Sequence, residues 1–272
     1  MSPQSNQPIG IFDSGVGGLT VVRAVRKRLP HEDIVYLGDT ARVPYGSKSA
    51  ETVIRYSHAC AQFLLSQEVK LLMVACNTAS AHAMSALRRT VGVPVIGAVE
   101  PGAQTAQEAT VSRHVGVVGT LGTVRSGAYQ AALRVLDPDI TVAGQACPLF
   151  VPLAEEGWLE GDVPRMIARR YIDELAAAHP AIDTLVLGCT HYPLLQGIIG
   201  EVAAAAWGRR IALVDSASAM ARAAEATLTA RDERRQEGNG SLRAFVTDAS
   251  RLDEVAPRFL GEPLDHYSRV DL

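Results

Sequence analysis

The chain has 272 residues, of which 47% are hydrophobic and 20% are charged, and its formal net charge at pH 7 is -3. A chain of this length buries about three quarters of the surface that its unfolded form exposes, so it can form a core without disulfide or metal staples. Because the charge is small and negative, the protein has no field that gathers polyanions, and we expect no nucleic acid and no membrane surface as its main partner.

The first residues, MSPQSNQP, are polar and carry neither a basic start nor an apolar stretch, so no secretory signal is visible. No uninterrupted apolar segment is long enough to span a bilayer. The four cysteines, Cys60, Cys76, Cys147 and Cys189, are spread along the chain without short spacings. This distribution favours reduced thiols over a disulfide framework, and we expect a cytoplasmic protein.

Short apolar runs alternate with longer stretches of helical periodicity along the chain. Strands are predicted at residues 8–13, 33–38, 70–75, 93–98, 115–119, 140–146, 183–188 and 211–215. Helices are predicted at residues 18–29, 50–67, 79–90, 123–136, 163–178 and 216–230. The strands are nearly continuously hydrophobic, which is typical of parallel sheets covered by helices on both faces. We therefore expect an α/β protein with mainly parallel sheets.

The last part of the chain has a different character. Residues 230–240, ARDERRQEGNG, are charged and contain glycine, which predicts a mobile connection. After it, SLRAFVTD and PLDHYSRVDL predict edge strands around one more short helix.

The sequence contains an internal repeat. IGIFDSGVGGLTV at 9–21 resembles VGVVGTLGTVRSG at 115–127, and LMVACNTAS at 72–80 resembles LVLGCTHYP at 185–193. The second match pairs Cys76 with Cys189. The repeat predicts two related lobes arranged about a pseudo-twofold axis, so that equivalent strand ends face each other.

Cys76 and Cys189 each come directly after a predicted strand, where open parallel sheets bind their ligands. A thiol at a helix N-terminus is exposed to the positive end of the dipole, which lowers its pKa from about 8.5. A free cysteine is often buried and inert, but two at equivalent places in repeated lobes favour a functional pair. Cys60, inside a predicted helix, and Cys147, directly before a proline, are assigned to packing.

Two other stretches carry candidate site residues. Asp13 and Ser14 end the first predicted strand, next to glycines that allow a ligand to approach the backbone, although Asp13 would also serve as a plain helix cap. DSGVGGL does not complete the G-x-G-x-x-G pattern, so no nucleotide is indicated. In the polar stretch 38–49, Tyr45 and Gly46 could present a phenol and an amide to a substrate.

His191 lies two residues after Cys189 and is expected to tune that thiol or share its proton. Glu155 follows an apolar stretch and either lies near the site of the second lobe or belongs, with Glu156, to a solvated helix turn. The histidines and cysteines show no H-E-x-x-H or paired C-x-x-C arrangement, so no metal is expected.

Two acid/base groups of the same kind on opposite sides of a molecule suit stereochemical inversion at a carbon. A thiolate removes the Cα proton on one face and the opposed thiol delivers a proton to the other. The developing carbanion needs fixed donors around the α-carboxylate. The candidates are the backbone amides and hydroxyls of Ser14, Asn77, Thr78 and Thr190.

A pyridoxal cofactor would need a Schiff-base lysine. Of the three lysines, Lys27 is at a charged helix end and Lys70 begins a strand, which leaves Lys48 without a recognisable partner for the pyridine ring. We therefore expect proton transfer without a cofactor.

The motifs GIFDSGVGGLTV, YLGDTARVPYGSKS, VACNTASA, LVLGCTHYPLL and VDSA, in this order, resemble those of the glutamate racemases of the aspartate/glutamate racemase family. The resemblance covers roughly residues 8 to 225. It implies a two-domain α/β fold, no cofactor, interconversion of L- and D-glutamate, and supply of D-glutamate for peptidoglycan. The catalytic residues carried over are Cys76, Cys189, Asp13, His191 and Glu155. The substrate-binding residues carried over are Asp13, Ser14, Tyr45, Gly46, Asn77, Thr78, Thr190 and His191.

The resemblance also implies where the chain crosses between lobes. The first lobe would comprise residues 1–98 and 211–272, and the second residues 99–210, with the active site at their interface. A homodimer is expected.

Three alternatives stay open at the level of sequence. A racemase of another acidic or small amino acid would use the same cysteine pair; aspartate differs from glutamate by one methylene, which is worth only about 1–3 kcal/mol of discrimination. A binding or regulatory protein could keep the fold without turnover, although the intact cysteines and DSGVGG argue against it. Redox use of the facing thiols is disfavoured by the absence of C-x-x-C.

Overall fold

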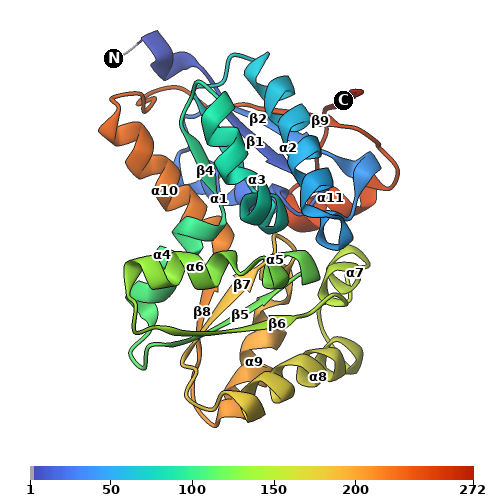
Figure 1. Ribbon diagram of the computed structural model, residues 1–272. Coiled ribbons are helices and arrows are strands. Elements are labelled where there is room, and N and C mark those ends of the chain that lie inside the picture. The colour runs from blue at the N-terminus through green and yellow to red at the C-terminus, as the bar shows by residue number, and fades with distance from the viewer. Residues whose placement is uncertain (1–2) are drawn as a thin grey trace.

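Two parallel β-sheets, each covered by helices on both faces, organise the chain, and this confirms the expected α/β fold (Figure 1). The computed structural model describes residues 3–272. The larger sheet has six strands in the order β10-β9-β2-β1-β3-β4. In that order the strands are Tyr267–Arg269, Leu242–Val246, Ile34–Gly38, Ile9–Asp13, Leu71–Val74 and Val95–Gly97.

The smaller sheet has four strands in the order β6-β5-β7-β8. These are Thr141–Ala146, His114–Gly119, Thr184–Gly188 and Ala212–Asp215. Strand β8 pairs with β7, with Leu187 opposite Asp215. The prediction that the first lobe resumes at residue 211 is therefore wrong, because β8 extends the second sheet. We propose that the chain leaves the first lobe after residue 98 and returns to it after Asp215.

The core is divided among the faces of the two sheets. On the larger sheet, one face is covered by α1 (Leu19–Arg28), α10 (Ser216–Ala230) and α11 (Leu252–Leu260), and the other by α2 (Ala50–Leu65) and α3 (Asn77–Thr90). On the smaller sheet, α7 (Phe150–Glu155), α8 (Asp162–Ala178) and α9 (Gln196–Trp207) cover one face, and α4 (Val99–Ala109) and α6 (Ala128–Leu136) the other. Strands β1, β2, β3 and β7 are buried along their whole length, as their continuous apolar sequences predict.

The helix predicted over 123–136 is two helices. Gly127 has φ +67 and ends α5 (Leu121–Ser126) before α6 begins. A left-handed residue of this kind stops a helix, and glycine takes it at no steric cost. Helices α4, α7 and α9 were not predicted. None of the helices within residues 3–272 is both long and apolar enough to cross a membrane.

The stretch 230–240, predicted to be mobile, is bound to the first lobe at several points. The Lys70 ammonium donates to the Glu233 carbonyl at 2.8 Å, and the Arg235 amide donates to Glu32 Oε1 at 2.8 Å. Lys70 and Glu32 form a buried ion pair at 2.6 Å. The prediction fails because the partners are distant in sequence. The predicted terminal strands and short helix are confirmed as β9, α11 and β10, but only β10 is at an edge.

Candidate functional site

The carboxyl ends of the two sheets meet across the boundary between the lobes. Thr190, which follows β7, donates through Oγ1 to Asp13 Oδ1 at the end of β1, at 3.4 Å. Its carbonyl accepts from Thr20 Oγ1 at 3.0 Å. At another point on the boundary, the hydroxyls of Thr78 in the first lobe and Thr120 in the second lie 2.8 Å apart. Helices α3 and α5 lie where the upper and lower lobes of Figure 1 meet.

Cys76 lies between β3 and α3 and is the N-cap residue of α3, where its sulfur accepts the Ala79 amide at 3.4 Å. The side chain is buried. Burial raises the pKa of the Cys76 thiol to about 12, and the neighbouring Asp13 carboxylate adds to this increase. A hydrogen bond from Ser14 acts in the opposite direction. The helix dipole was expected to lower this pKa, but the loss of solvation outweighs it, so Cys76 holds its proton at neutral pH.

Cys189 lies after β7, at the place in the second lobe that corresponds to Cys76, and it is buried. Its sulfur is 3.9 Å from His191 Nδ1. The opposite ring nitrogen, Nε2, is 2.8 Å from Glu155 Oε1. A chain of three side chains therefore runs from the Cys189 sulfur to the half-exposed Glu155 carboxylate.

His191 is charged in this environment. Burial alone would lower the pKa of its imidazole, but the hydrogen bonds to Cys189 and Glu155 outweigh burial and raise it to about 10. The ring also packs edge-on against Phe259 of the first lobe, with centroids 4.9 Å apart. A positive charge beside Cys189 offsets negative charge on that sulfur.

Asp13 is fully buried at the end of β1. Burial raises the pKa of its carboxyl, and the His191 charge and the backbone amides of Gly18 and Gly15 work against the increase. Gly15 donates to Asp13 Oδ2 at 3.0 Å. Asp13 is thus close to the surroundings of both cysteines. Its charge raises the pKa of Cys76, and its carboxylate accepts a hydrogen bond from Thr190, the residue after Cys189.

Asn77 and Thr78 form the first turn of α3, directly after Cys76. The first amides of a helix have no intrahelical partner, and they create positive potential at the N-terminus, where an anion binds. The side-chain amide of Asn77 contacts Tyr129 and Ser216. These residues can present several donors to a carboxylate.

The Tyr45–Gly46 segment touches the second lobe through its glycine. A side chain at Gly46 would collide with Thr120, the nearest atom lying 2.7 Å from the added carbon, so only glycine allows this approach. The Tyr45 phenol is buried and donates to Asp39. Asp39 also binds Arg42 Nε at 2.8 Å. The phenol is therefore occupied within the first lobe, and the backbone of this segment is what faces the boundary.

Thr120 and Tyr129 were not predicted, yet both reach across to α3. In the internal repeat Thr120 corresponds to Ser14, since both follow the first strand of their lobe. The internal repeat could therefore have predicted Thr120 as a site residue. Tyr129 has no such counterpart motif, and its contact with Asn77 depends on how the lobes pack.

The other two cysteines are also buried, each within one lobe. Cys60 lies in α2, 3.9 Å from the Tyr45 hydroxyl, and burial raises the pKa of its thiol to about 12. Cys147 follows β6, its sulfur donates to the Gln145 carbonyl at 3.5 Å, and burial raises its pKa as well. Both thiols are protonated packing residues.

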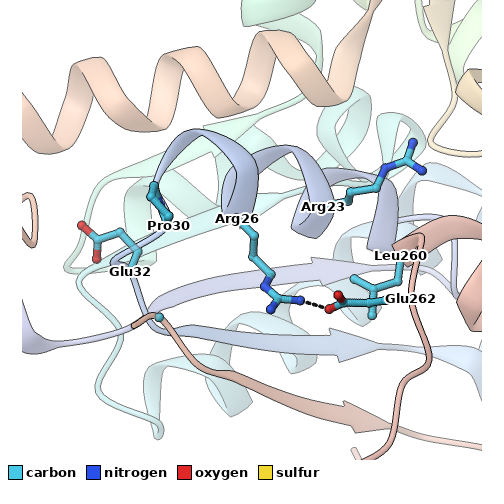
Figure 2. Close-up of a pocket in the computed structure, with 7 residues that line it drawn as sticks. Arg23, Arg26, Pro30, Glu32, Leu260 and Glu262 are labelled. Carbon is cyan, nitrogen blue, oxygen red and sulfur yellow. Dashed lines mark hydrogen bonds and ion pairs between the residues drawn. The ribbon is translucent and has the colours of Figure 1, made fainter. Parts of the chain in front are cut away.

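A pocket of about 290 Å³ lies beside α1 and the chain after α11 (Figure 2). Arg26 and Glu262 form an ion pair across it. None of the predicted site residues lines this pocket. Among residues 3–272, no three His, Cys, Asp or Glu side chains are grouped so that they could hold a metal ion.

Residues 19–224 match the family model described as Asp/Glu/Hydantoin racemase, which is more than half of the chain. The chain belongs to this family. It is 51% identical over 266 residues to the glutamate racemase of Geobacter metallireducens, a match that covers 97% of this chain and 96% of that protein. Membership of the family makes the chain an isomerase.

Solved structures agree with this assignment. The crystal structure of glutamate racemase from Thermus thermophilus, in complex with beta-chloro-D-alanine, is 44% identical, with a TM-score of 0.88 and 98% of each chain covered. The structure of glutamate racemase from Francisella tularensis, in complex with D-glutamate, is 34% identical, with a TM-score of 0.90 and the same coverage.

Proposed function

We propose that this isomerase interconverts L- and D-glutamate without a cofactor, with Cys76 and Cys189 as the two acid/base groups. The observation that carries the proposal is the placement of the two buried thiols at corresponding strand ends, on either side of the boundary where the two sheets meet. Thr190, the residue after Cys189, also donates to Asp13 across this boundary at 3.4 Å, which supports a shared site for the two cysteines.

The reaction is a pair of proton transfers. One sulfur, as thiolate, takes the proton from Cα, and the electron pair of the C–H bond remains on the carbanion. The other sulfur, as thiol, gives its proton to the opposite face of Cα and becomes the thiolate. The product has inverted configuration, and the two thiols have exchanged protonation states, so the reverse reaction uses the same groups in exchanged roles.

The environments of the two sulfurs fit the start of such a cycle. Cys76 holds its proton, while the His191 charge lies beside Cys189. We propose that Glu155 keeps His191 charged and oriented, and that Asp13 serves the Cys76 side in the corresponding way. A buried site of this kind strengthens each charge interaction.

The carbanion step needs donors at the α-carboxylate, because charge moves onto that group as the proton leaves. We propose that the first turn of α3 supplies them through Asn77 and Thr78, with Ser14 and Thr190 from the ends of β1 and β7. The Tyr45–Gly46 backbone completes the set from the first lobe. Asn77, Thr78 and Thr190 are fixed by burial and by hydrogen bonds between the lobes, which lowers the reorganisation that the transition state requires.

The substrate is assigned as glutamate on the strength of the relatives. The Geobacter metallireducens protein is a glutamate racemase, and the Francisella tularensis structure contains D-glutamate. Purified protein should be incubated with L-glutamate and, separately, with L-aspartate in D2O, and the optical rotation and the deuterium at Cα followed. Racemisation of glutamate is the expected result. Racemisation of aspartate alone, or of neither, would contradict the assignment.

We further propose that the enzyme supplies D-glutamate for peptidoglycan synthesis in the cytoplasm. All four cysteines of the chain are free thiols, which fits a reducing compartment. A homodimer stays a prediction, and light scattering of the purified protein measures it.

A further inference from the structure

A buried tyrosine of the second lobe holds one of the proposed substrate donors of the first lobe. Tyr129 lies in α6, and its hydroxyl donates to Asn77 Oδ1 at 2.7 Å. Both side chains are almost fully buried, at 1% and 2% exposure. Burial raises the pKa of the Tyr129 phenol, so the hydroxyl keeps its proton and stays a donor at physiological pH.

The surroundings of Tyr129 fix where its hydroxyl points. A side chain added at Gly102 of α4 would come within 3.0 Å of the phenol oxygen, and one added at Gly188 of β7 would come within 3.4 Å of the ring. The ring is thus packed between a helix and a strand of its own lobe, and its hydroxyl reaches α3. This contact joins the lobes directly beside Cys76, because Asn77 is the next residue.

The two ends of the Asn77 amide have different partners. Its oxygen accepts the Tyr129 hydroxyl, whereas its NH2 group donates to Ser216 Oγ at 3.4 Å. An amide NH2 group has two donor hydrogens, and Ser216 takes one of them through a long bond. If the amide rotated by half a turn, its oxygen would take the place of the NH2 group, and an acceptor at that position would repel a carboxylate.

We infer that Tyr129 is a positioning residue of the racemase, which fixes the Asn77 amide so that its NH2 group faces the substrate carboxylate. The inference rests on the proposed function, since it names the donor end that the glutamate α-carboxylate meets. It assigns Tyr129 an effect on substrate affinity that acts through Asn77 alone, without contact between the phenol and the reacting atoms.

The test is a double-mutant cycle of Tyr129→Phe and Asn77→Ala, with KM and kcat for glutamate measured in both directions. We expect Tyr129→Phe to raise KM about 10-fold, because a misoriented Asn77 amide loses its hydrogen bond to the charged α-carboxylate. The same variant should change kcat by less than about 3-fold. In the Asn77→Ala background the same change should have no further effect, because coupled residues are not additive. An additive effect, or an unchanged KM in Tyr129→Phe, would overturn the inference.

Two further variants distinguish a specific role of Tyr129 from a general folding defect. Gly102→Ala presses on the phenol without removing it, and it should raise KM in the same direction. Tyr171→Phe is the matched control, because it removes another phenol contact in the same lobe, to the Leu149 amide at 3.4 Å, and it should leave KM unchanged. An increase of KM in Tyr171→Phe equal to that in Tyr129→Phe would contradict a specific role.

Turnover of the wild-type enzyme separates the two proposals. If the wild type racemises aspartate and not glutamate, the substrate assignment fails, and the same cycle measured with aspartate still decides the role of Tyr129. If the wild type racemises glutamate and the cycle is additive, only the role of Tyr129 fails.

Discussion

The two halves of the candidate site have the same backbone plan and opposite electrostatics. Cys76 and Cys189 each follow a buried central strand of a parallel sheet. Cys76 has a buried carboxylate, Asp13, as its charged neighbour, and Cys189 has the imidazolium of His191. A repeated scaffold therefore places two equal groups beside neighbours of opposite charge.

The proposed function uses this contrast, because it requires one thiol to act as acid while the other acts as base. Two thiols in identical settings would tend to hold the same protonation state, but inversion needs one proton donor and one acceptor at every moment. Burial and Asp13 keep the proton on Cys76, whereas the other sulfur lies 3.9 Å from the charged imidazole of His191. Variants that remove one neighbour at a time test whether the two halves differ in this way.

The largest effect is expected from the sulfurs themselves. Cys76→Ala and Cys189→Ala should each lower kcat for racemisation by about 10³-fold or more, because each removes a proton carrier that the other cannot replace. Racemisation followed by circular dichroism measures this. Cys60→Ala is the matched control and should retain turnover, since Cys60 is a buried packing residue of α2. Retained turnover in either of the first two variants would refute the two-base assignment.

On the Cys189 side, replacing His191 should lower activity more than replacing Glu155, because Glu155 lies farther from the sulfur. His191→Asn removes the charge 3.9 Å from the sulfur and should lower kcat/KM by about 10²-fold. Glu155→Gln leaves the imidazole in place and should cost about 10-fold, because Glu155 acts only through His191. Steady-state kinetics in both directions test this order. A larger loss in Glu155→Gln than in His191→Asn would contradict it.

On the Cys76 side, replacing Asp13 should lower the activity and raise the stability of the protein. Burial raises the pKa of Asp13, so its ionised form is disfavoured in the folded state, and this penalty is present above the folded pKa and vanishes as pH falls below the unfolded value. Asp13→Asn should lower kcat/KM about 10-fold and raise the free energy of unfolding at pH 8 by about 1 kcal/mol. Urea unfolding measures the second quantity. A variant that is less stable at pH 8 would show that the carboxylate is net stabilising.

The last expected effect concerns stability and not turnover, and it is the pH dependence that His191 adds. Its folded pKa of about 10 lies above its ordinary value of 6.5, so its contribution is fully present below pH 6.5 and is lost as pH rises through 10. The difference in unfolding free energy between wild type and His191→Asn should therefore shrink by about 2 kcal/mol from pH 6 to pH 10. A difference that stays constant over this range would show that His191 is not charged in the folded state.

Those features of the fold and site that depend on local pattern could be predicted from the sequence. The apolar runs located the strands, and the repeat paired Cys76 with Cys189 at matching strand ends. The resemblance named Thr190 and Asn77 as site residues, and the structure brings both to the boundary between the lobes. Their roles stay predictions until the variants are measured.

Features that depend on distant partners could not be predicted. The position of Glu155 beside His191 depends on how α7 packs, and spacing alone left a solvated turn equally open. Tyr45 was expected to offer its phenol to a substrate, but Asp39 takes that hydroxyl. Helix α9 is apolar on most sides, so it lacks the amphipathic pattern that predicts a surface helix.

The most direct test of the two-base account is to stop the reaction of L-glutamate in D2O at low conversion and measure deuterium in each enantiomer by mass spectrometry. The account predicts deuterium at Cα of the D-glutamate formed and almost none in the L-glutamate recovered, because the proton is removed by one sulfur and a solvent-derived deuteron is delivered by the other. Transfer of the original hydrogen to the product, or equal deuterium in both enantiomers, would indicate a single base and would contradict the account.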